Sequence, residues 1–152
     1  MRILVIFLLT SISIHVLAEC DDNAQNRIVT GDSPNGVRLY ASIKGKGPSW
    51  ASEFHQEEFT YIGKLQNNLE VAVIFTSWGA ACRGTTRLLL FRDNKYLGNY
   101  SINPFDGMIK LRDNKIVFPY SKDTGNKIDL SKGIPEEVWL DGELPGFGKS
   151  EL

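Results

Sequence analysis

The chain has 152 residues, with 17 lysines and arginines against 18 aspartates and glutamates, so its formal net charge at pH 7 is −1. This balance argues against a nucleic-acid-binding protein and against one held at an anionic membrane surface, because both depend on a positively charged surface. No basic stripe is apparent along the chain, and we expect no nucleic acid partner. The length suffices for one ordinary domain with a substantial core.

The N-terminus has the organisation of a secretory signal peptide. Arg2 is followed by an apolar run over residues 3–9, and Val16 and Ala18 occupy the −3 and −1 positions of a cleavage site after Ala18. The apolar run is too short to cross about 30 Å of hydrocarbon, and no later stretch reaches the roughly 20 apolar residues of a spanning helix. We therefore expect export, and no membrane insertion after cleavage.

The predicted organisation is a signal peptide over residues 1–18 and a single β-rich domain over residues 19–152, located in the periplasm or secreted. An uncleaved N-terminal anchor and a lipidated Cys20 are the alternatives. Lipidation requires small residues before the cleaved bond, and Glu19 directly before Cys20 argues against it.

The predicted mature chain holds two cysteines, Cys20 and Cys82. An even number of cysteines in an exported chain favours a disulfide. On the loop-entropy model, closing a loop of this length would stabilise the fold by about 4 kcal/mol. Two free thiols, or a bridge to another chain, remain the alternatives to a Cys20–Cys82 bridge.

The first half of the predicted domain is less regular than the second. Ile28 and Val29 suit a minor strand, and residues 32–36 read Asp-Ser-Pro-Asn-Gly, a turn signal. Residues 37–44 alternate apolar and polar side chains, which predicts a half-buried strand. Residues 50–58 are compatible with a short helix or with an irregular loop.

Three hairpins are predicted in the centre. Residues 59–65 and 69–76 form the first, and the apolar character of both faces of the second strand indicates that it is covered on both sides. The motif Arg-Asp-Asn-Lys occurs twice, at residues 92–95 and 112–115, each time between an incoming and an outgoing strand. Since Asp and Asn tolerate left-handed backbone, both motifs suit tight turns. The two hairpins predict an up-and-down meander of four strands.

The C-terminal part is predicted to hold a short strand at residues 127–130 and a last apolar patch at residues 138–140, followed by a loose tail. The resulting fold class is mainly β, a single antiparallel domain of about eight strands with little helix, arranged as a meander, sandwich or half-barrel.

No catalytic set, metal site or cofactor site is predicted. Cys82 follows an apolar strand but has only His55 as an imidazole partner in the mature chain, and Cys20 competes for its sulfur. His55 with Glu58 supplies half of a zinc site at most. The acidic pairs Glu57-Glu58 and Glu136-Glu137 leave a carboxylate-dependent hydrolase of the cell envelope as an alternative.

Aromatic and arginine side chains near the central turns are the candidates for contact with a partner protein, because these residue types carry much of the energy at interfaces. Ordinary packing of large side chains at strand ends is the competing interpretation. The predicted function is that of a small exported protein that acts by binding, as a periplasmic inhibitor or immunity-type protein; an envelope structural or assembly component is a further alternative. The candidate contact residues are Trp78, Arg83, Arg87, Arg92, Tyr100, Arg112 and Tyr120.

Overall fold

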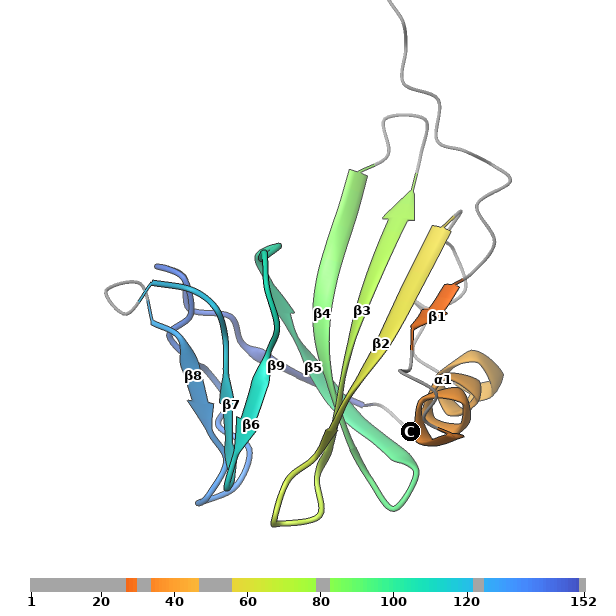
Figure 1. Ribbon diagram of the computed structural model, residues 1–152, viewed down its shortest axis with the longest axis horizontal. Coiled ribbons are helices and arrows are strands. Elements are labelled where there is room, and N and C mark those ends of the chain that lie inside the picture. The colour runs from red at the N-terminus through yellow and green to blue at the C-terminus, as the bar shows by residue number, and fades with distance from the viewer. Residues whose placement is uncertain (1–26, 30–33, 47–55, 79–82, 122–124, 151–152) are drawn as a thin grey trace, which may run out of the picture.

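The computed structural model describes residues 27–29, 34–46, 56–78, 83–121 and 125–150 (Figure 1). The described part is mainly β with one helix, which confirms the predicted fold class. The elements are β1 (Arg27–Val29), α1 (Pro34–Lys46), β2 (Gln56–Lys64), β3 (Glu70–Trp78), β4 (Arg83–Arg92), β5 (Lys95–Ile102), β6 (Lys110–Arg112), β7 (Lys115–Val117), β8 (Lys127–Asp129) and β9 (Phe147–Lys149).

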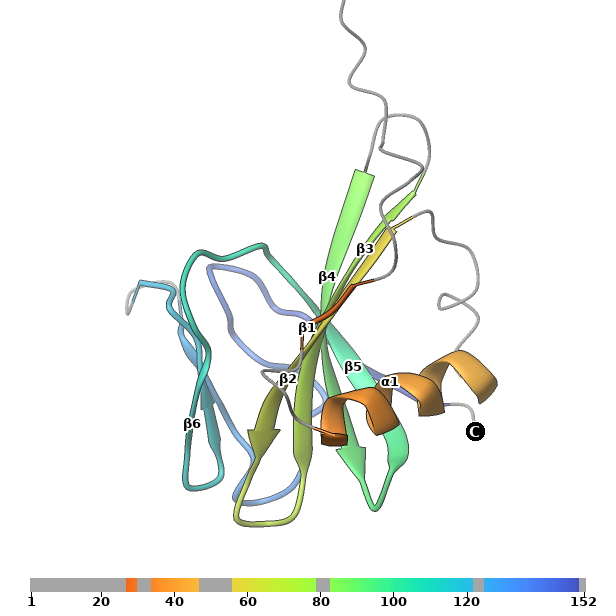
Figure 2. The same cartoon turned by 45° about the vertical axis from the view of Figure 1, so that its right-hand side comes forward.

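The strands form two sheets of unequal size. The large sheet has six strands in the order β1-β2-β3-β4-β5-β9, and only β1 and β2 run parallel. The small sheet has three antiparallel strands in the order β6-β7-β8. Helix α1 lies on one face of the large sheet and the small sheet lies on the other (Figures 1 and 2).

The middle strands of the large sheet are therefore buried on both faces. Val71 and Leu88 pack toward the small sheet, whereas Ala72, Ile74 and Leu89 pack toward α1. All five side chains are fully buried. This confirms the prediction that the strand after the first hairpin turn is covered on both sides, since a strand with two buried faces reads as a continuous apolar run.

Residues 37–44 form part of α1, so the predicted strand there is wrong. Leu39 and Ile43, four residues apart, lie on one helical face and are buried against the large sheet, while Val37 is 54% exposed. In a strand these three side chains would share one face. The turn predicted at residues 32–36 is wrong for residues 34–36, because the helix begins at Pro34. Proline is favoured at the first position of a helix.

The predicted four-stranded meander is divided between the two sheets. β4 and β5 pair in the large sheet, and β6 and β7 pair in the small one. Both Asp-Asn turns use left-handed backbone as predicted, with φ of 50° at Asp93 and 54° at Asp113. The second turn is joined to the β2–β3 turn, where the Asn67 amide N–H donates to Asn114 Oδ1 at 2.9 Å.

The C-terminal tail is not loose as predicted. β9 pairs with β5, and the Ser150 amide donates to the Leu97 carbonyl at 2.9 Å. The Phe147 ring lies 4.9 Å from the Tyr100 ring, measured between centroids. The tail orders because it supplies hydrogen-bond partners to β5, whose outer edge would otherwise be unpaired. Of residues 50–58, the segment predicted as a short helix or a loop, residues 50–55 lie outside the described part, and residues 56–58 begin β2.

No helix among the described residues is both long enough and apolar enough to span a bilayer.

Candidate binding site

The structure does not bring the predicted contact residues together on one surface. Trp78 and Arg83 are partners in the register at one end of β3 and β4, whereas Arg92 ends β4 at its far end. At about 3.3 Å per residue, the two ends of β4 are roughly 30 Å apart. Arg112 is exposed on β6, in the other sheet.

Two of the predicted contact residues lie partly or fully in the interior. Arg87 is half-buried on the α1 side of β4, and its Nη1 donates to Thr76 Oγ1 at 3.0 Å. Burial lowers the pKa of the Arg87 guanidinium from its ordinary value. Tyr100 is fully buried, and its hydroxyl donates to the Pro135 carbonyl. Tyr100 therefore cannot contact a partner in the folded protein, because its strand position faces the core between the sheets.

Tyr120 belongs to an aromatic cluster at the end of the small sheet. Its ring stacks on Phe118 with 5.3 Å between centroids, and its hydroxyl donates to the Asn103 carbonyl at 2.6 Å. Burial, together with the negative charges of Asp141 and Glu143, raises the pKa of Tyr120 to about 12.

The raised pKa of Tyr120 implies that the stability of the protein depends on pH in the alkaline range. An unfolded tyrosine has a pKa of about 10, so the folded state holds the Tyr120 proton more tightly. Its contribution to stability is complete below pH 10 and is lost as the pH rises toward 12. We expect the free energy of unfolding to fall less steeply over this range in Tyr120→Phe than in the wild type. Denaturant titrations at a series of alkaline pH values measure this slope, and equal slopes would contradict the assignment.

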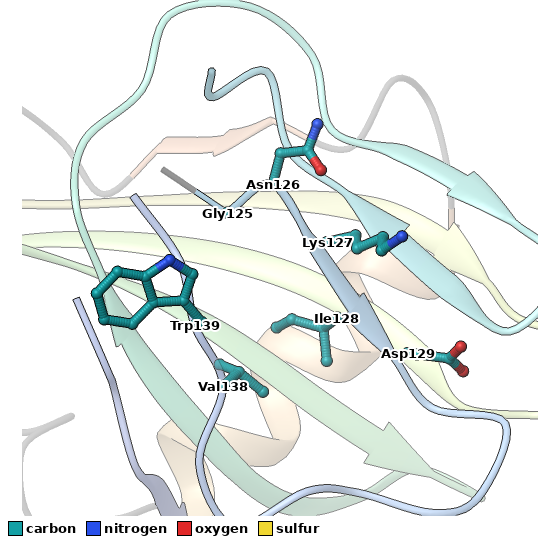
Figure 3. A pocket seen from close by; sticks show the side chains of 7 residues that line it. All are labelled: Gly125, Asn126, Lys127, Ile128, Asp129, Val138 and Trp139. Carbon is teal, nitrogen blue, oxygen red and sulfur yellow. The ribbon is translucent and has the colours of Figure 1, made fainter. Parts of the chain in front are cut away.

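The strongest candidate site is a hollow beside β8 (Figure 3). It has a volume of ≈ 550 Å³ and is lined by residues 125–129 on one side and by Val138 and Trp139 on the other. The buried side chains of Ile128 and Val138 form its floor, and Trp139, 54% exposed, forms a wall.

One end of the hollow is closed by a close approach of two segments. The Asp141 amide donates to the Gly125 carbonyl at 3.1 Å. Gly125 has a φ of +79°, and a Cβ there would lie 2.7 Å from Cδ1 of Trp139. Only glycine satisfies both conditions without strain. Glycine at residue 125 therefore permits Trp139 to lie against the chain just before β8.

The backbone along the hollow has free hydrogen-bonding capacity. The Phe118 amide donates to the Asn126 carbonyl, and the Leu130 amide donates to the Asn114 carbonyl. In an antiparallel pair every second residue bonds to the same neighbouring strand, so the backbone N–H and C=O of Ile128 also face β7. The N–H and C=O groups of Lys127 and Asp129 consequently point away from β7, into the hollow. Within the described part of the chain, no strand pairs with this edge.

The outer face of the small sheet is strongly basic. Register places Leu111, Ile116 and Ile128 on the inner face, so the other residues of these strands face outward. They comprise four basic residues and a single acidic one, which forms an ion pair with Lys115 at 3.7 Å. The outward-facing residues are Lys110, Arg112, Lys115, Val117, Lys127 and Asp129.

This face corrects the expectation that the chain has no basic stripe. Lys110 and Arg112 lie on β6, whereas Lys115 and Lys127 are each the only basic residue of their strand, so the four gather only when the three strands pair. The predicted absence of a nucleic acid partner rested on that expectation and stays a prediction.

Trp139 was not among the predicted contact residues. A signal for it exists in the sequence, since it lies between Val138 and Leu140, which are both buried. In an extended segment the middle one of three consecutive apolar residues must face the opposite side from its neighbours. The apolar patch predicted over residues 138–140 thus contains one side chain for the surface.

A separate hollow of ≈ 330 Å³ lies between β2–β3 and the β5–β6 connection. Its apolar lining includes Val73, Phe105 and Met108, and the Met108 side chain is 80% exposed. Among the described residues that line it none is charged, and the hydroxyl groups of Thr60 and Tyr61 are its polar side-chain groups. It therefore offers fewer groups that could orient a ligand than the hollow beside β8.

The predicted disulfide stays a prediction, because Cys20 and Cys82 lie outside the described residues, as does His55. Among the residues that are described, no three His, Cys, Asp or Glu side chains are grouped so as to hold a metal ion.

No family model, no curated protein and no solved structure matches the chain.

Proposed function

We propose that this chain is a small exported protein that acts by binding, as a periplasmic inhibitor or immunity-type protein that blocks a partner protein. Export is inferred from the signal-peptide pattern of residues 1–18, and binding from the surface beside β8. The observation that carries the proposal is the exposed Trp139 at the wall of a hollow with an apolar floor.

A tryptophan in this position has the properties of an interface anchor. Its large ring offers apolar area at little cost in side-chain entropy, and tryptophan is enriched among residues whose removal weakens complexes most. The floor formed by Ile128 and Val138 belongs to the core between the sheets, so the wall and the floor are held by the fold. A rigid site loses less entropy on binding than a mobile one.

Replacement of Trp139 tests this function. With the purified mature chain as bait in an envelope extract of the producing cells, we expect one enriched protein whose own activity falls when the bait is added. We expect Trp139→Ala to weaken that complex by at least about 30-fold, corresponding to about 2 kcal/mol for an anchor residue. Because Trp139 is half exposed, its replacement should change the unfolding free energy little.

Met108→Ala is the matched control, since it also removes a large exposed apolar side chain but from the second hollow. Equal capture by the wild type and by Trp139→Ala, or no captured protein at all, would overturn the proposal. A partner that keeps its activity in the complex would favour an envelope assembly component, and glycan cleavage by the isolated chain would favour the carboxylate-dependent hydrolase.

A further inference from the structure

We propose that the hollow beside β8 takes an extended, acidic segment of the partner protein as an added strand. The inference rests on the proposed function and specifies the chemistry of the partner. It joins two observations that are independent of Trp139: the outward-facing backbone groups of Lys127 and Asp129, and the basic outer face of the small sheet.

The free backbone groups of β8 favour a peptide as the ligand. Along the free edge of β8 they alternate between donors and acceptors, at Lys127 and again at Asp129. Another peptide backbone presents the complementary alternation, which is the basis of strand addition to a sheet edge. A phosphate backbone offers acceptors alone and would leave the two carbonyl groups without donors. A bilayer surface is too flat to enter a hollow with a raised tryptophan wall.

The side chains select the composition of the segment. In an added strand, the residue opposite Ile128 points to the inner face, toward the apolar floor that Val138 completes, and should be apolar. Its neighbour opposite Lys127 points outward, onto the basic face, and should be acidic. Asp129 is already paired with Lys115 and accepts hydrogen bonds from both the amide and the hydroxyl of Ser131, so its negative charge is partly offset and Lys127 sets the preference for an acidic residue.

A second copy of this chain fits the edge less well. Two β8 edges related by a two-fold axis would place Lys127 opposite Asp129 of the other copy, so charge alone does not rule out this pairing. However, the edge lies in a concave hollow, and two concave surfaces leave a void between them. A single protruding segment fills the hollow, whereas the self-complementary pairing does not.

Defined probes test the inference without the natural partner. An end-capped octapeptide of alternating Asp and Val is compared with one of alternating Lys and Val, with a single-stranded oligonucleotide, and with phosphatidylglycerol vesicles. We expect the Asp-Val peptide to bind most tightly. Hydrogen exchange should show the amides of Lys127 and Asp129 exchanging fast in the free protein and slowly in the complex, with the Ile128 amide protected in both states.

Two substitutions of Lys127 separate the contribution of its charge from that of its backbone N–H. Lys127→Gln removes only the charge and should weaken the Asp-Val peptide about threefold, as expected for an exposed ion pair. Lys127→Pro also removes the outward N–H, and the loss should reach at least about tenfold. Proline is tolerated on an edge strand where the N–H faces solvent, and continued protection of the Ile128 amide verifies that β8 still pairs with β7. An Asp-Val peptide N-methylated on the ladder side, which leaves the protein unchanged, should not bind.

The inference is overturned if the Asp-Val peptide does not bind, or if the Lys-Val peptide, the oligonucleotide or the vesicles bind at least as well. It is also overturned if binding leaves exchange at Lys127 and Asp129 unchanged. Because no captured partner is used, these outcomes are distinct from a failure of the proposed function, which would appear as absent capture or as an unaffected Trp139→Ala variant.

Discussion

Gly98→Ala should detach β9 from β5 and destabilise the domain by more than about 3 kcal/mol, through strain at a disfavoured φ combined with a backbone clash. Gly98 lies opposite Lys149 in the β5–β9 register and has a φ of +150°. A Cβ there would collide with the Gly148 carbonyl oxygen and would lie 2.6 Å from Cζ of Phe147. Because one obstacle is backbone, no side-chain rotation relieves the clash, and the strand itself must move.

Gly133→Ala is the matched control for this experiment. Gly133 has a φ of +110°, but a Cβ there would meet nothing within 4 Å, so the substitution introduces backbone strain alone. We expect it to cost about 1 kcal/mol. Urea denaturation measures both variants, and hydrogen exchange at Ser150 reports the loss of its bond to Leu97. Equal destabilisation by the two substitutions would contradict the tight β5–β9 approach.

Leu39→Ala should destabilise the protein by about 2 to 5 kcal/mol, the range for truncating a large side chain in a packed core. Leu39 is fully buried and packs with Ile43, Phe59 and Ile74 between α1 and the large sheet. The loss combines the lost transfer of apolar atoms from water with the cavity left behind, because the helix is held by the neighbouring side chains and cannot collapse into the space.

Val37→Ala on the same element decides whether this segment is a helix or a strand. In α1 the Val37 side chain is 54% exposed, so its truncation should change the free energy of unfolding by less than about 0.5 kcal/mol. In the strand that the alternation suggested, Val37 would lie beside Leu39 in the core and its loss would be costly. Urea denaturation of the two variants gives both values, and a costly Val37→Ala would refute the helix.

The ambiguity at residues 37–44 has a simple physical origin. The apolar residues of that segment are spaced by two, as on one face of a strand, but two of them, Leu39 and Ile43, are also spaced by four, as on one face of a helix. A single buried pair satisfies either period. The helix is favoured over the strand because of the large sheet. On that face β2, β3 and β4 present apolar side chains, and a single helix covers them.

The candidate site was predicted even less completely than the fold. Tyr100 and Arg87 have residue types suited to an interface, but the strands turn them into the interior. Arg112 lies on the basic face, which forms only because three short strands align residues from different turns of the chain. Trp139 carries a local signal, but the hollow beside it depends on the path of the chain after β8.

Local pattern alone determined the hairpins of this protein, because the alternation of side chains and the preference of Asp and Asn for left-handed backbone act over a few residues. Tertiary structure decided the rest: the division of four similar strands between two sheets, the pairing of β9 with β5, and the helix over residues 34–46. These features depend on contacts between residues distant along the chain, where burial and backbone hydrogen bonding outweigh local preference. The surface that we propose for binding belongs to this second group, since its charged face and its free edge exist only after the strands have paired.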